Sequence, residues 1–235
     1  MKYMGSKNRI AKYILPIILK DRKPDQWYVE PFCGGCNSLD KVSNPRIGND
    51  INKYLVALVR DVQQEYPYID KEQYDAIKQN PKDYPDWLVG YAGIVASYCG
   101  KWFGGYAGKV NTKEGVRDYM QEGIKNLSLQ LCNLQGVTFS SVPYQKLTIP
   151  ENSIIYCDPP YKGTTQYKDD FDHFAFYAWC RDMKRKGHAV FVSEYSMPND
   201  FECIWELPVK SSLSANGLVG GNKISVERLF KVKDA

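Results

Sequence analysis

The chain has 235 residues, of which 43% are hydrophobic and 25% are charged. This composition is that of a globular protein and excludes a disordered chain or a coiled coil as the default. The length suits one catalytic domain with an inserted lobe. The net charge of +4 and the pI near 8.5 permit contact with phosphates but fall short of a highly basic nucleic-acid binder.

The chain shows no signal for secretion or for a membrane. The segment Met1–Lys7 lacks the apolar core of a signal peptide, and the apolar run Tyr13–Leu19 is too short to span a bilayer. Seven scattered cysteines favour reduced thiols. Cys33 and Cys36 have the spacing of a metal knuckle, but no second such pair exists and we expect no metal. We expect a soluble, cytoplasmic protein.

The pattern of elements predicts an α/β domain interrupted by a helical lobe. The chain begins with a helix (7–20), a strand (27–31), a glycine turn with a short helix, and a strand (46–49). Proline-broken helical segments follow, at 52–65, 71–79, 86–99 and 113–134. The α/β pattern then resumes with strands 137–140 and 153–157, a helix at 172–186, a strand at 188–194, and a hairpin of 203–210 with 224–232. We therefore predict a mostly parallel catalytic domain of residues 1–51 and 135–235, and a lobe of residues 52–134.

The strongest motif is the segment Asp158-Pro159-Pro160-Tyr161, which follows an apolar strand. Ligands of open α/β sheets bind beyond the carboxyl ends of the strands, and two prolines there hold the backbone extended. An aromatic amine is a weak nucleophile, so an enzyme must accept hydrogen bonds from its N–H groups. The Asp158 carboxylate and the Pro159 carbonyl are two such acceptors, and Tyr161 offers a face on which an extruded base can stack. The alternative is a simple turn after a buried strand.

Two further features follow the first two predicted strands. In Val29–Gly35 a strand runs into a Gly34-Gly35 turn, which allows close approach of a ligand to the backbone. The alternative is a tight turn without a ligand. Asp50 follows the next strand, where an acidic side chain commonly accepts hydrogen bonds from ribose hydroxyls. It could equally be the N-cap of the next helix.

These motifs, in this order, resemble those of the Dam-like N6-adenine DNA methyltransferases of phages and bacteria. The resemblance rests on Tyr3–Lys7, Glu30–Gly35, Asp50–Asn52 and Asp158–Tyr161 and covers nearly the whole chain. It implies a Rossmann-like methyltransferase fold that binds S-adenosylmethionine. The residues that the resemblance assigns to the cofactor are Tyr3, Gly5, Lys7, Glu30, Pro31, Phe32, Gly34, Asp50, Ile51, Pro143, Tyr144 and Asp158.

Within this resemblance, Tyr3 and Lys7 help to hold the cofactor, Glu30–Gly35 wraps its methionine part, and Asp50 with Ile51 holds its adenosine. Pro143 and Tyr144 are expected beside the cofactor adenine, and Tyr167 near the flipped base. The sequence departs from the family pattern at Cys36 and Asn37, where relatives often have smaller residues.

The family's inserted lobe reads the target sequence. Here the glycine-rich segment Tyr98–Lys109, with interleaved aromatic and lysine residues, is the candidate for insertion beside bases. The residues expected to contact DNA are Lys101, Trp102, Lys109 and Arg117. The alternative is a flexible surface loop next to an ordinary amphipathic helix.

The resemblance thus implies a methyltransferase that flips an adenine out of double-stranded DNA and methylates N6, and the motif requires no covalent enzyme intermediate. We expect a monomer or weak dimer; any partner restriction endonuclease is a separate chain. The same acceptor geometry would suit cytosine N4, an RNA base or a glutamine amide. A catalytically silent DNA-binding module is the rival from another class.

Overall fold

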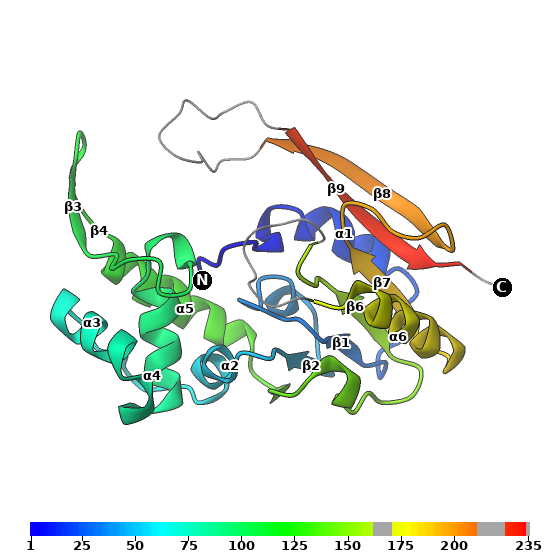
Figure 1. Cartoon of the computed structure of the whole chain (residues 1–235), viewed down its shortest axis with the longest axis horizontal. Helices are drawn as coiled ribbons and strands as arrows, with labels where there is room; N and C mark the ends of the chain where they lie inside the picture. The colour runs from blue at the N-terminus through cyan, green and yellow to red at the C-terminus, as the bar shows by residue number, and fades with distance from the viewer. Residues whose placement is uncertain (162–170, 211–223, 234–235) are drawn as a thin grey trace. The chain divides into compact units, whose positions relative to one another are not determined.

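The computed structural model describes residues 1–161, 171–210 and 224–233, which form two compact units (Figure 1). One unit comprises Met1–Lys12 and Pro31–Thr148, and the other comprises Tyr13–Glu30 and Ile149–Ala235. Below they are called the N-terminal-turn unit and the terminal-hairpin unit. Among the described residues, no helix combines the length and the apolar character needed to cross a membrane.

The terminal-hairpin unit is built on strands in the order β1–β6–β7–β9–β8. β1, β6 and β7 run parallel, whereas β9 is antiparallel to both β7 and β8. Helix α6 packs against β7 and β9. The strands and helices are β1 (Tyr28–Glu30), β6 (Ile154–Cys157), β7 (Ala189–Ser193), β8 (Phe201–Lys210), β9 (Ile224–Val232), α6 (His173–Arg185) and α1 (Ala11–Ile18), which starts in the other unit.

Strand β6 is the central element of this unit. All four of its residues, Ile154–Cys157, are buried, as expected for a parallel strand covered on both faces. The chain leaves the carboxyl end of this strand at Asp158. The sheet therefore holds the start of the Asp158–Tyr161 segment on a rigid element.

The N-terminal-turn unit contains the parallel strand pair β2 (Arg46–Asn49) and β5 (Val137–Ser140). Its helices are α2 (Lys53–Arg60), α3 (Lys71–Gln79), α4 (Asp86–Gly90) and α5 (Tyr119–Asn133). Short turns of helix are η1 (Lys7–Arg9), η2 (Leu39–Lys41), η3 (Pro81–Asp83), the π-helical η4 (Tyr91–Val95), η5 (Tyr98–Gly100) and η6 (Tyr144–Lys146). Strands β3 (Lys109–Thr112) and β4 (Gly115–Asp118) form an antiparallel hairpin.

Helices α2 and α4 pack closely because Gly90 has no side chain. A Cβ atom at Gly90 would lie 2.0 Å from the carbonyl oxygen of Tyr54 on α2. Helix α2 itself begins at an N-cap, Asn52, whose side chain accepts hydrogen bonds from the backbone N–H groups of Tyr54 and Leu55. The alternative role of Asp50 as the N-cap of this helix is therefore wrong.

The α/β fold predicted from the sequence is confirmed by the parallel pairings within each unit. Several elements have the predicted bounds, including β2, α3, β5 and β9. Three predicted helices are shorter: the helix at 7–20 is η1 followed by α1, that at 52–65 ends at Arg60, and that at 86–99 ends with the π-helical turn η4. The boundary of the 52–134 lobe stays a prediction.

The predicted helix at 113–134 is wrong at its start. Residues 109–118 form the β3–β4 hairpin, because Gly115, with a φ of +115°, turns the chain between two segments that contain Val110 and Val116. Helix α5 begins only after Asp118, whose carboxylate accepts from the backbone N–H of Gln121 at 3.0 Å. The hairpin projects away from α3, α4 and α5 (Figure 1), and nearly all its residues are exposed.

Candidate functional site

The N-terminal segment folds into a tight turn around Gly5. The backbone N–H of Ser6 donates to the carbonyl of Tyr3 at 3.2 Å, and Gly5 has a φ of +81°. This combination is typical of a type II turn, in which the third position favours glycine. The Ser6 side chain accepts from the N–H of Asn8 and caps η1, which begins at Lys7. The turn thus fixes the backbone at Tyr3 and Lys7, two residues expected at the cofactor.

The glycine turn after β1 lies directly against Tyr3. A Cβ atom at Gly34 would lie 2.8 Å from Cε1 of Tyr3, and one at Gly35 would lie 2.5 Å from its Cβ. Gly34 also has a φ of +47°, which disfavours other residues, and the N–H of Cys36 closes the turn on the carbonyl of Cys33. Both glycines are therefore required by the close approach of Tyr3.

The Asp50 carboxylate supports the same turn. Its Oδ2 accepts from the N–H of Gly34 at 3.0 Å, and its Oδ1 accepts from the N–H of Asn52 at 2.9 Å. Burial raises the pKa of Asp50 above 3.8, and these two hydrogen bonds to the charged form oppose the rise. Its neighbour Ile51 leaves 71% of its surface exposed. A carboxylate and an exposed apolar side chain therefore stand together at the end of β2.

Asn49, the last residue of β2, ties three segments together. It is 1% exposed. Its Nδ2 donates to the carbonyls of Pro31 at 3.0 Å and Val142 at 2.9 Å, while its Oδ1 accepts from Ser140 Oγ and Val142 N–H. Reasoning from the sequence missed this residue. The available signal was an asparagine at the end of a short predicted strand, since an amide that is buried there must find partners.

The segments joined by Asn49 bring Phe32 and Tyr144 together. Their ring centroids lie 5.2 Å apart at an interplanar angle of 45°. Tyr144 is 9% exposed and begins η6, whereas Pro143 before it is exposed. The structure therefore groups the predicted cofactor residues of this unit into two contacting sets, Tyr3 with Gly34 and Asp50, and Phe32 with Tyr144.

These residues fit an adenosine-containing cofactor by their chemistry. A carboxylate has about four sites that accept hydrogen bonds, and the two protein bonds of Asp50 leave capacity for ribose hydroxyls. The exposed Ile51 offers apolar area that a purine would cover. The Gly34-Gly35 backbone presents no side chain that would block approach of a ligand.

The terminal-hairpin unit holds the Asp158–Tyr161 segment. Tyr156, near the end of β6, forms a hydrogen bond between its hydroxyl and Oγ of Ser193 at 2.8 Å. Burial raises the pKa of Tyr156 well above 10, and the negative charge of Asp158 raises it further. Asp158 is half-buried, Pro159 is buried and Pro160 is half-buried. The hydroxyl of Tyr156 therefore stays protonated at neutral pH, and the charge of Asp158 favours this state.

Tyr161 is held by two side chains of the same unit. Its hydroxyl donates to Oε2 of Glu227 on β9 at 3.0 Å, and its ring meets Tyr195 edge-on, with centroids 4.6 Å apart. Burial, followed by the charges of Asp158 and Glu227, raises the pKa of Tyr161 well above 10. Glu227 was expected only as part of a strand. A glutamate in a predicted strand does not reveal that its side chain contacts a residue as distant in the sequence as Tyr161.

We expect Tyr161→Ala to weaken DNA binding roughly 5- to 150-fold, because base stacking on an aromatic ring contributes about 1–3 kcal/mol. Tyr161→Phe keeps the ring and loses only the bond to Glu227, so its effect should be smaller and should match that of Glu227→Leu. The dissociation constant for labelled duplex, from fluorescence anisotropy, measures both effects. An alanine variant with a wild-type dissociation constant would remove Tyr161 from the base-binding role.

Glu30, the last residue of β1, is a buried carboxylate of this unit. It is 2% exposed, and its Oε1 accepts from the hydroxyl of Tyr28 at 2.8 Å. Its charge also contributes to the raised pKa of Tyr156 and of Cys157, after burial and other neighbours. The charges of Asp158, Glu30 and Glu227 all contribute to the raised pKa of Tyr156.

The lobe residues predicted to contact DNA differ in exposure and packing. Trp102 is 39% exposed and stacks on Tyr54 with centroids 5.9 Å apart, and a Cβ atom at Gly93 would lie 2.5 Å from its ring. This packing anchors the glycine-rich segment and argues against a freely inserting loop at Trp102. Lys101 beside it is exposed.

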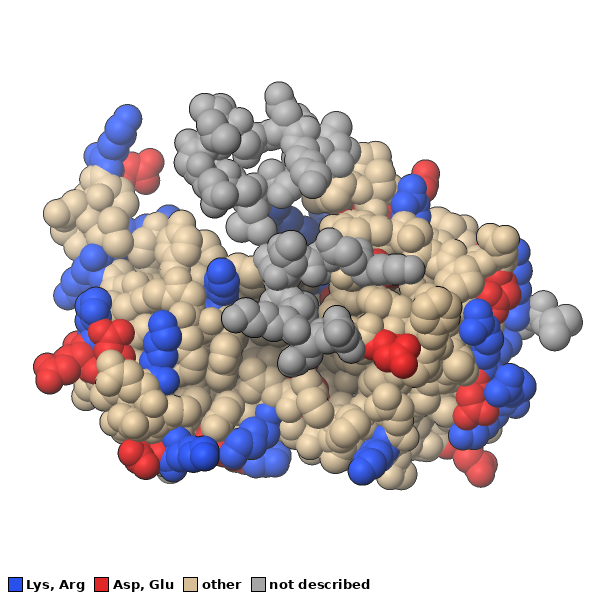
Figure 2. Space-filling view, in the orientation of Figure 1, with Lys and Arg blue, Asp and Glu red and all other residues tan. Residues whose placement is uncertain are grey.

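Lys109 and Arg117 lie on the hairpin, on neighbouring strands. The side chain of Lys109 is exposed, with its Nζ 3.9 Å from Oδ2 of Asp118. Arg117 donates to both carboxylate oxygens of Glu122, at 2.5 and 2.9 Å, and lies over the ring of Tyr119. At the hairpin tip both basic and acidic side chains are visible (Figure 2). Arg117 is thus partly neutralised, and Lys109 is the more available cation.

Tyr167 lies outside the described residues. None of the seven cysteines, which all lie in the described ranges, forms a disulfide. Cys33 and Cys36 are buried, and the described ranges 1–161, 171–210 and 224–233 hold no cluster of three or more potential metal ligands.

Comparison with known families matches residues 3–86 to the D12 class N6 adenine-specific DNA methyltransferases. The match covers the Tyr3 turn, the glycine turn, Asp50 and the start of the lobe, and it ends before Asp158. It confirms the predicted resemblance and, with it, the prediction of an enzyme. No curated protein matches the chain.

Solved structures show only a distant likeness. A Haemophilus influenzae protein assigned as a methylase has 10% identity and a TM-score of 0.38, over 97% of this chain and all of that one. SMU.472, a protein assigned as a methyltransferase and complexed with SAH, has 11% identity and a TM-score of 0.40. A Listeria monocytogenes protein assigned as a class I S-adenosylmethionine-dependent methyltransferase has 12% identity and a TM-score of 0.41. This chain covers 53% and 60% of the last two, respectively, and TM-scores this low carry no weight for the function.

Proposed function

We propose that this chain, whose residues 3–86 match the D12 class N6 adenine-specific DNA methyltransferases, methylates adenine N6 in double-stranded DNA with S-adenosylmethionine as the donor. The observation that carries the proposal is the placement of Asp158-Pro159-Pro160-Tyr161 at the carboxyl end of the buried parallel strand β6. Ligands of α/β sheets bind at this edge, and the segment offers the acceptors that an aromatic amine requires.

The chemistry follows from the weak nucleophilicity of an exocyclic amine. The Asp158 carboxylate and the Pro159 carbonyl accept hydrogen bonds from the two N–H groups of the amine. These bonds draw the nitrogen lone pair out of conjugation with the ring, so that it can attack. The new N–C bond forms as the S–C bond of the donor breaks, and the surplus amine proton leaves through Asp158 to water. No covalent enzyme intermediate is required, because the amine attacks the methyl carbon directly.

S-adenosylmethionine supplies the methyl group as a substituent of a positively charged sulfonium. The chain's own residues bind and orient it. Asp50 would accept hydrogen bonds from the ribose hydroxyls, the Gly34-Gly35 backbone would contact the methionine part, and Tyr3 and Lys7 would help to hold the cofactor. Phe32 and Tyr144 offer apolar area to the adenine. Asp158 and Glu30 favour the sulfonium through their negative charge.

The target adenine must leave the duplex to reach Asp158, because its N6 amine is stacked and paired within the double helix. Tyr161 receives the extruded base. Its hydroxyl bond to Glu227 and its edge contact with Tyr195 fix the ring before the base arrives, so little side-chain entropy is lost on stacking.

We assign the β3–β4 hairpin and the rest of the 52–134 lobe to DNA binding. The hairpin is exposed and carries Lys109, Lys113 and Arg117 within a few residues. Antiparallel two-stranded ribbons fit the major groove of B-DNA, and lysine contacts to phosphates contribute affinity without sequence preference. Within the proposal the chain acts as a monomer or weak dimer.

The double variant Lys109→Ala/Lys113→Ala should bind DNA roughly tenfold more weakly, and its log affinity should fall less steeply with log salt, by about 0.9 for each lost phosphate contact. Fluorescence anisotropy of labelled duplex at several salt concentrations measures both quantities. The matched control is Lys20→Ala/Lys23→Ala, which removes two exposed lysines outside the lobe. Equal salt slopes in the two double variants would exclude the hairpin from the phosphate contacts.

The function is tested by incubating the purified protein with labelled S-adenosylmethionine and unmodified genomic DNA, followed by digestion to nucleosides and mass spectrometry. Labelled N6-methyladenine is the expected product. Label on N4-methylcytosine would keep the chemistry and change the base. Cofactor binding without transfer to DNA would contradict the proposal and favour an RNA or protein amide substrate, or a silent DNA-binding module.

A further inference from the structure

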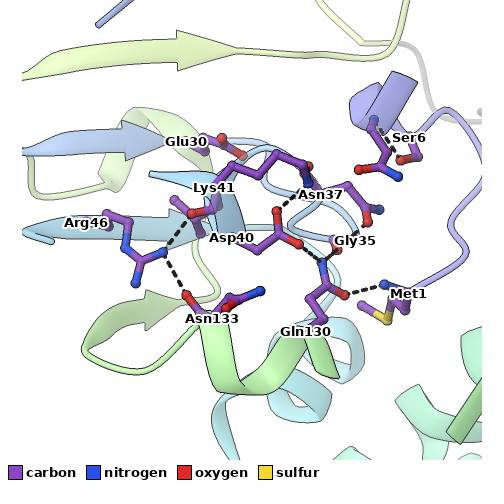
Figure 3. Close-up of polar contacts among 12 residues, drawn as sticks. Met1, Ser6, Glu30, Gly35, Asn37, Asp40, Lys41, Arg46, Gln130 and Asn133 are labelled. Carbon is purple, nitrogen blue, oxygen red and sulfur yellow. Dashed lines mark hydrogen bonds and ion pairs between the residues drawn. The ribbon is translucent and has the colours of Figure 1, made fainter. Parts of the chain in front are cut away.

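Gln130 is a buried polar residue on α5 that no motif explains. It is 4% exposed, and it lies 95 positions along the chain from the glycine turn that it contacts. Figure 3 shows its amide group between the glycine turn, η2 and the N-terminal residue. A buried amide in a helix must be fully hydrogen-bonded to avoid a large cost, so its partners show what it does.

Each end of the Gln130 amide has a partner. Its Nε2 donates to the carbonyl of Gly35 at 2.9 Å and to Oδ2 of Asp40 at 3.1 Å, with Oδ1 of Asn37 at 3.4 Å. Its Oε1 accepts from the amino group of Met1 at 2.5 Å. The two N–H groups therefore have distinct main targets, one on the glycine turn and one on η2.

The glycine turn is thus held from two sides. Asp50 accepts from the N–H of Gly34, and Gln130 donates to the carbonyl of the next residue, Gly35. Glycines restrict the backbone least, so this turn would sample many conformations without such contacts. The two side chains together select one conformation, and Tyr3 packs against it.

A second anchor connects α5 to η2 without touching the turn. Arg46 is 4% exposed, and its Nη1 donates to the carbonyls of Leu39 at 2.8 Å and Asn133 at 3.0 Å (Figure 3). A guanidinium at the C-terminal end of a helix also complements the helix dipole. Because Arg46 already fixes this end of α5, the contact of Gln130 with Gly35 is not needed merely to dock the helix.

We propose that Gln130 is a positioning residue for the cofactor turn. By holding the Gly35 carbonyl from the helix that follows the hairpin, it orders the Gly34-Gly35 backbone before the cofactor binds and so sets cofactor affinity. This inference rests on the proposed function, in which the turn lies along S-adenosylmethionine. Ordering a flexible turn in advance strengthens binding because the ligand then need not order it.

The first test is Gln130→Leu, which keeps the side-chain volume and removes the donor. S-adenosylhomocysteine should bind about tenfold more weakly, which corresponds to the loss of one buried hydrogen bond of the usual strength. Isothermal titration calorimetry measures the dissociation constant without any methyl transfer. The affinity of the variant for DNA should stay at the wild-type value.

Loss of the amide also affects stability, so a charge-swapped pair separates the two roles. In Gln130→Glu/Asp40→Asn, the new amide at position 40 can donate to the new carboxylate at position 130, and the Met1 amino group still has an acceptor. The Gly35 carbonyl, however, loses its donor and faces a carboxylate instead. We expect a melting temperature above that of Gln130→Leu together with cofactor binding that stays at least tenfold weaker.

The single variant Asp40→Asn is the matched control, because its side-chain oxygen still accepts from Gln130 and the Gly35 contact remains. Its cofactor affinity should equal that of wild type. Wild-type affinity in Gln130→Leu, or recovery of affinity in the swapped pair, would reduce Gln130 to a structural anchor and overturn the inference. Failure of the wild-type protein to bind S-adenosylhomocysteine at all would instead overturn the proposed function.

Discussion

Asp158→Ala is expected to lower methyl transfer by about 10³-fold or more, because the variant loses the acceptor and proton exit of the target amine. Cofactor affinity should fall far less, since the glycine turn and Asp50 are unchanged. Single-turnover transfer of labelled methyl to DNA measures the rate, and calorimetry with S-adenosylhomocysteine measures binding. Loss of both by the same factor would point to a folding defect.

The matched control for this variant is Asp200→Ala in the same unit. Asp200 is exposed, and its carboxylate pairs with Arg181. Surface ion pairs of this kind contribute little to stability, so this variant should keep wild-type activity. Wild-type transfer in Asp158→Ala would refute the assignment of the Asp158–Tyr161 segment as the catalytic centre.

Asp50→Ala is expected to weaken cofactor binding roughly 10- to 100-fold, because the variant loses hydrogen bonds from a charged group, each of which contributes about 1.5–3 kcal/mol. It also releases the N–H of Gly34 from its acceptor, which loosens the glycine turn. The dissociation constant of S-adenosylhomocysteine is the measurement. Unchanged affinity would exclude Asp50 from the ribose contact.

The raised pKa of Asp50 adds a pH dependence with a defined sign. The ionised carboxylate accepts hydrogen bonds from ribose hydroxyls, and the protonated form is the weaker acceptor. Cofactor affinity should therefore be constant at neutral pH and fall as pH drops through a midpoint above 3.8. For stability the sign is opposite: burial penalises the charged form, so this contribution is fully favourable below 3.8 and is lost as pH rises through the raised pKa. Asp50→Ala should lack both dependences.

The regular elements could be predicted where local pattern and tertiary packing agree. β6 follows from its run of apolar residues, and α3 follows from an Asp70 N-cap that forms a capping box with Gln73. The β3–β4 hairpin was missed because its residues are exposed and polar, so no alternation of apolar residues marks the strands. Only Gly115 and the β-branched residues around it distinguished the segment from the start of a helix.

The residues of the candidate site likewise differ in whether the sequence alone could predict them. Motif residues such as Asp50 and Gly34 follow strands, and their order along the chain is enough to predict them. Asn49 and Gln130 could not be assigned roles, because each acts through partners far away in the sequence. Glu227 likewise contacts Tyr161 only after β9 pairs with β7, and register between distant strands is not readable from composition.

The most direct test of the central claim is the content of N6-methyladenine in DNA from cells that lack adenine methylation and produce either the wild-type chain or its Asp158→Ala variant. Mass spectrometry of the digested nucleosides should find N6-methyladenine with the wild-type chain and none above background with the variant. Equal amounts in the two samples would contradict the role of Asp158, and absence from both, with folded protein present, would contradict adenine methylation itself.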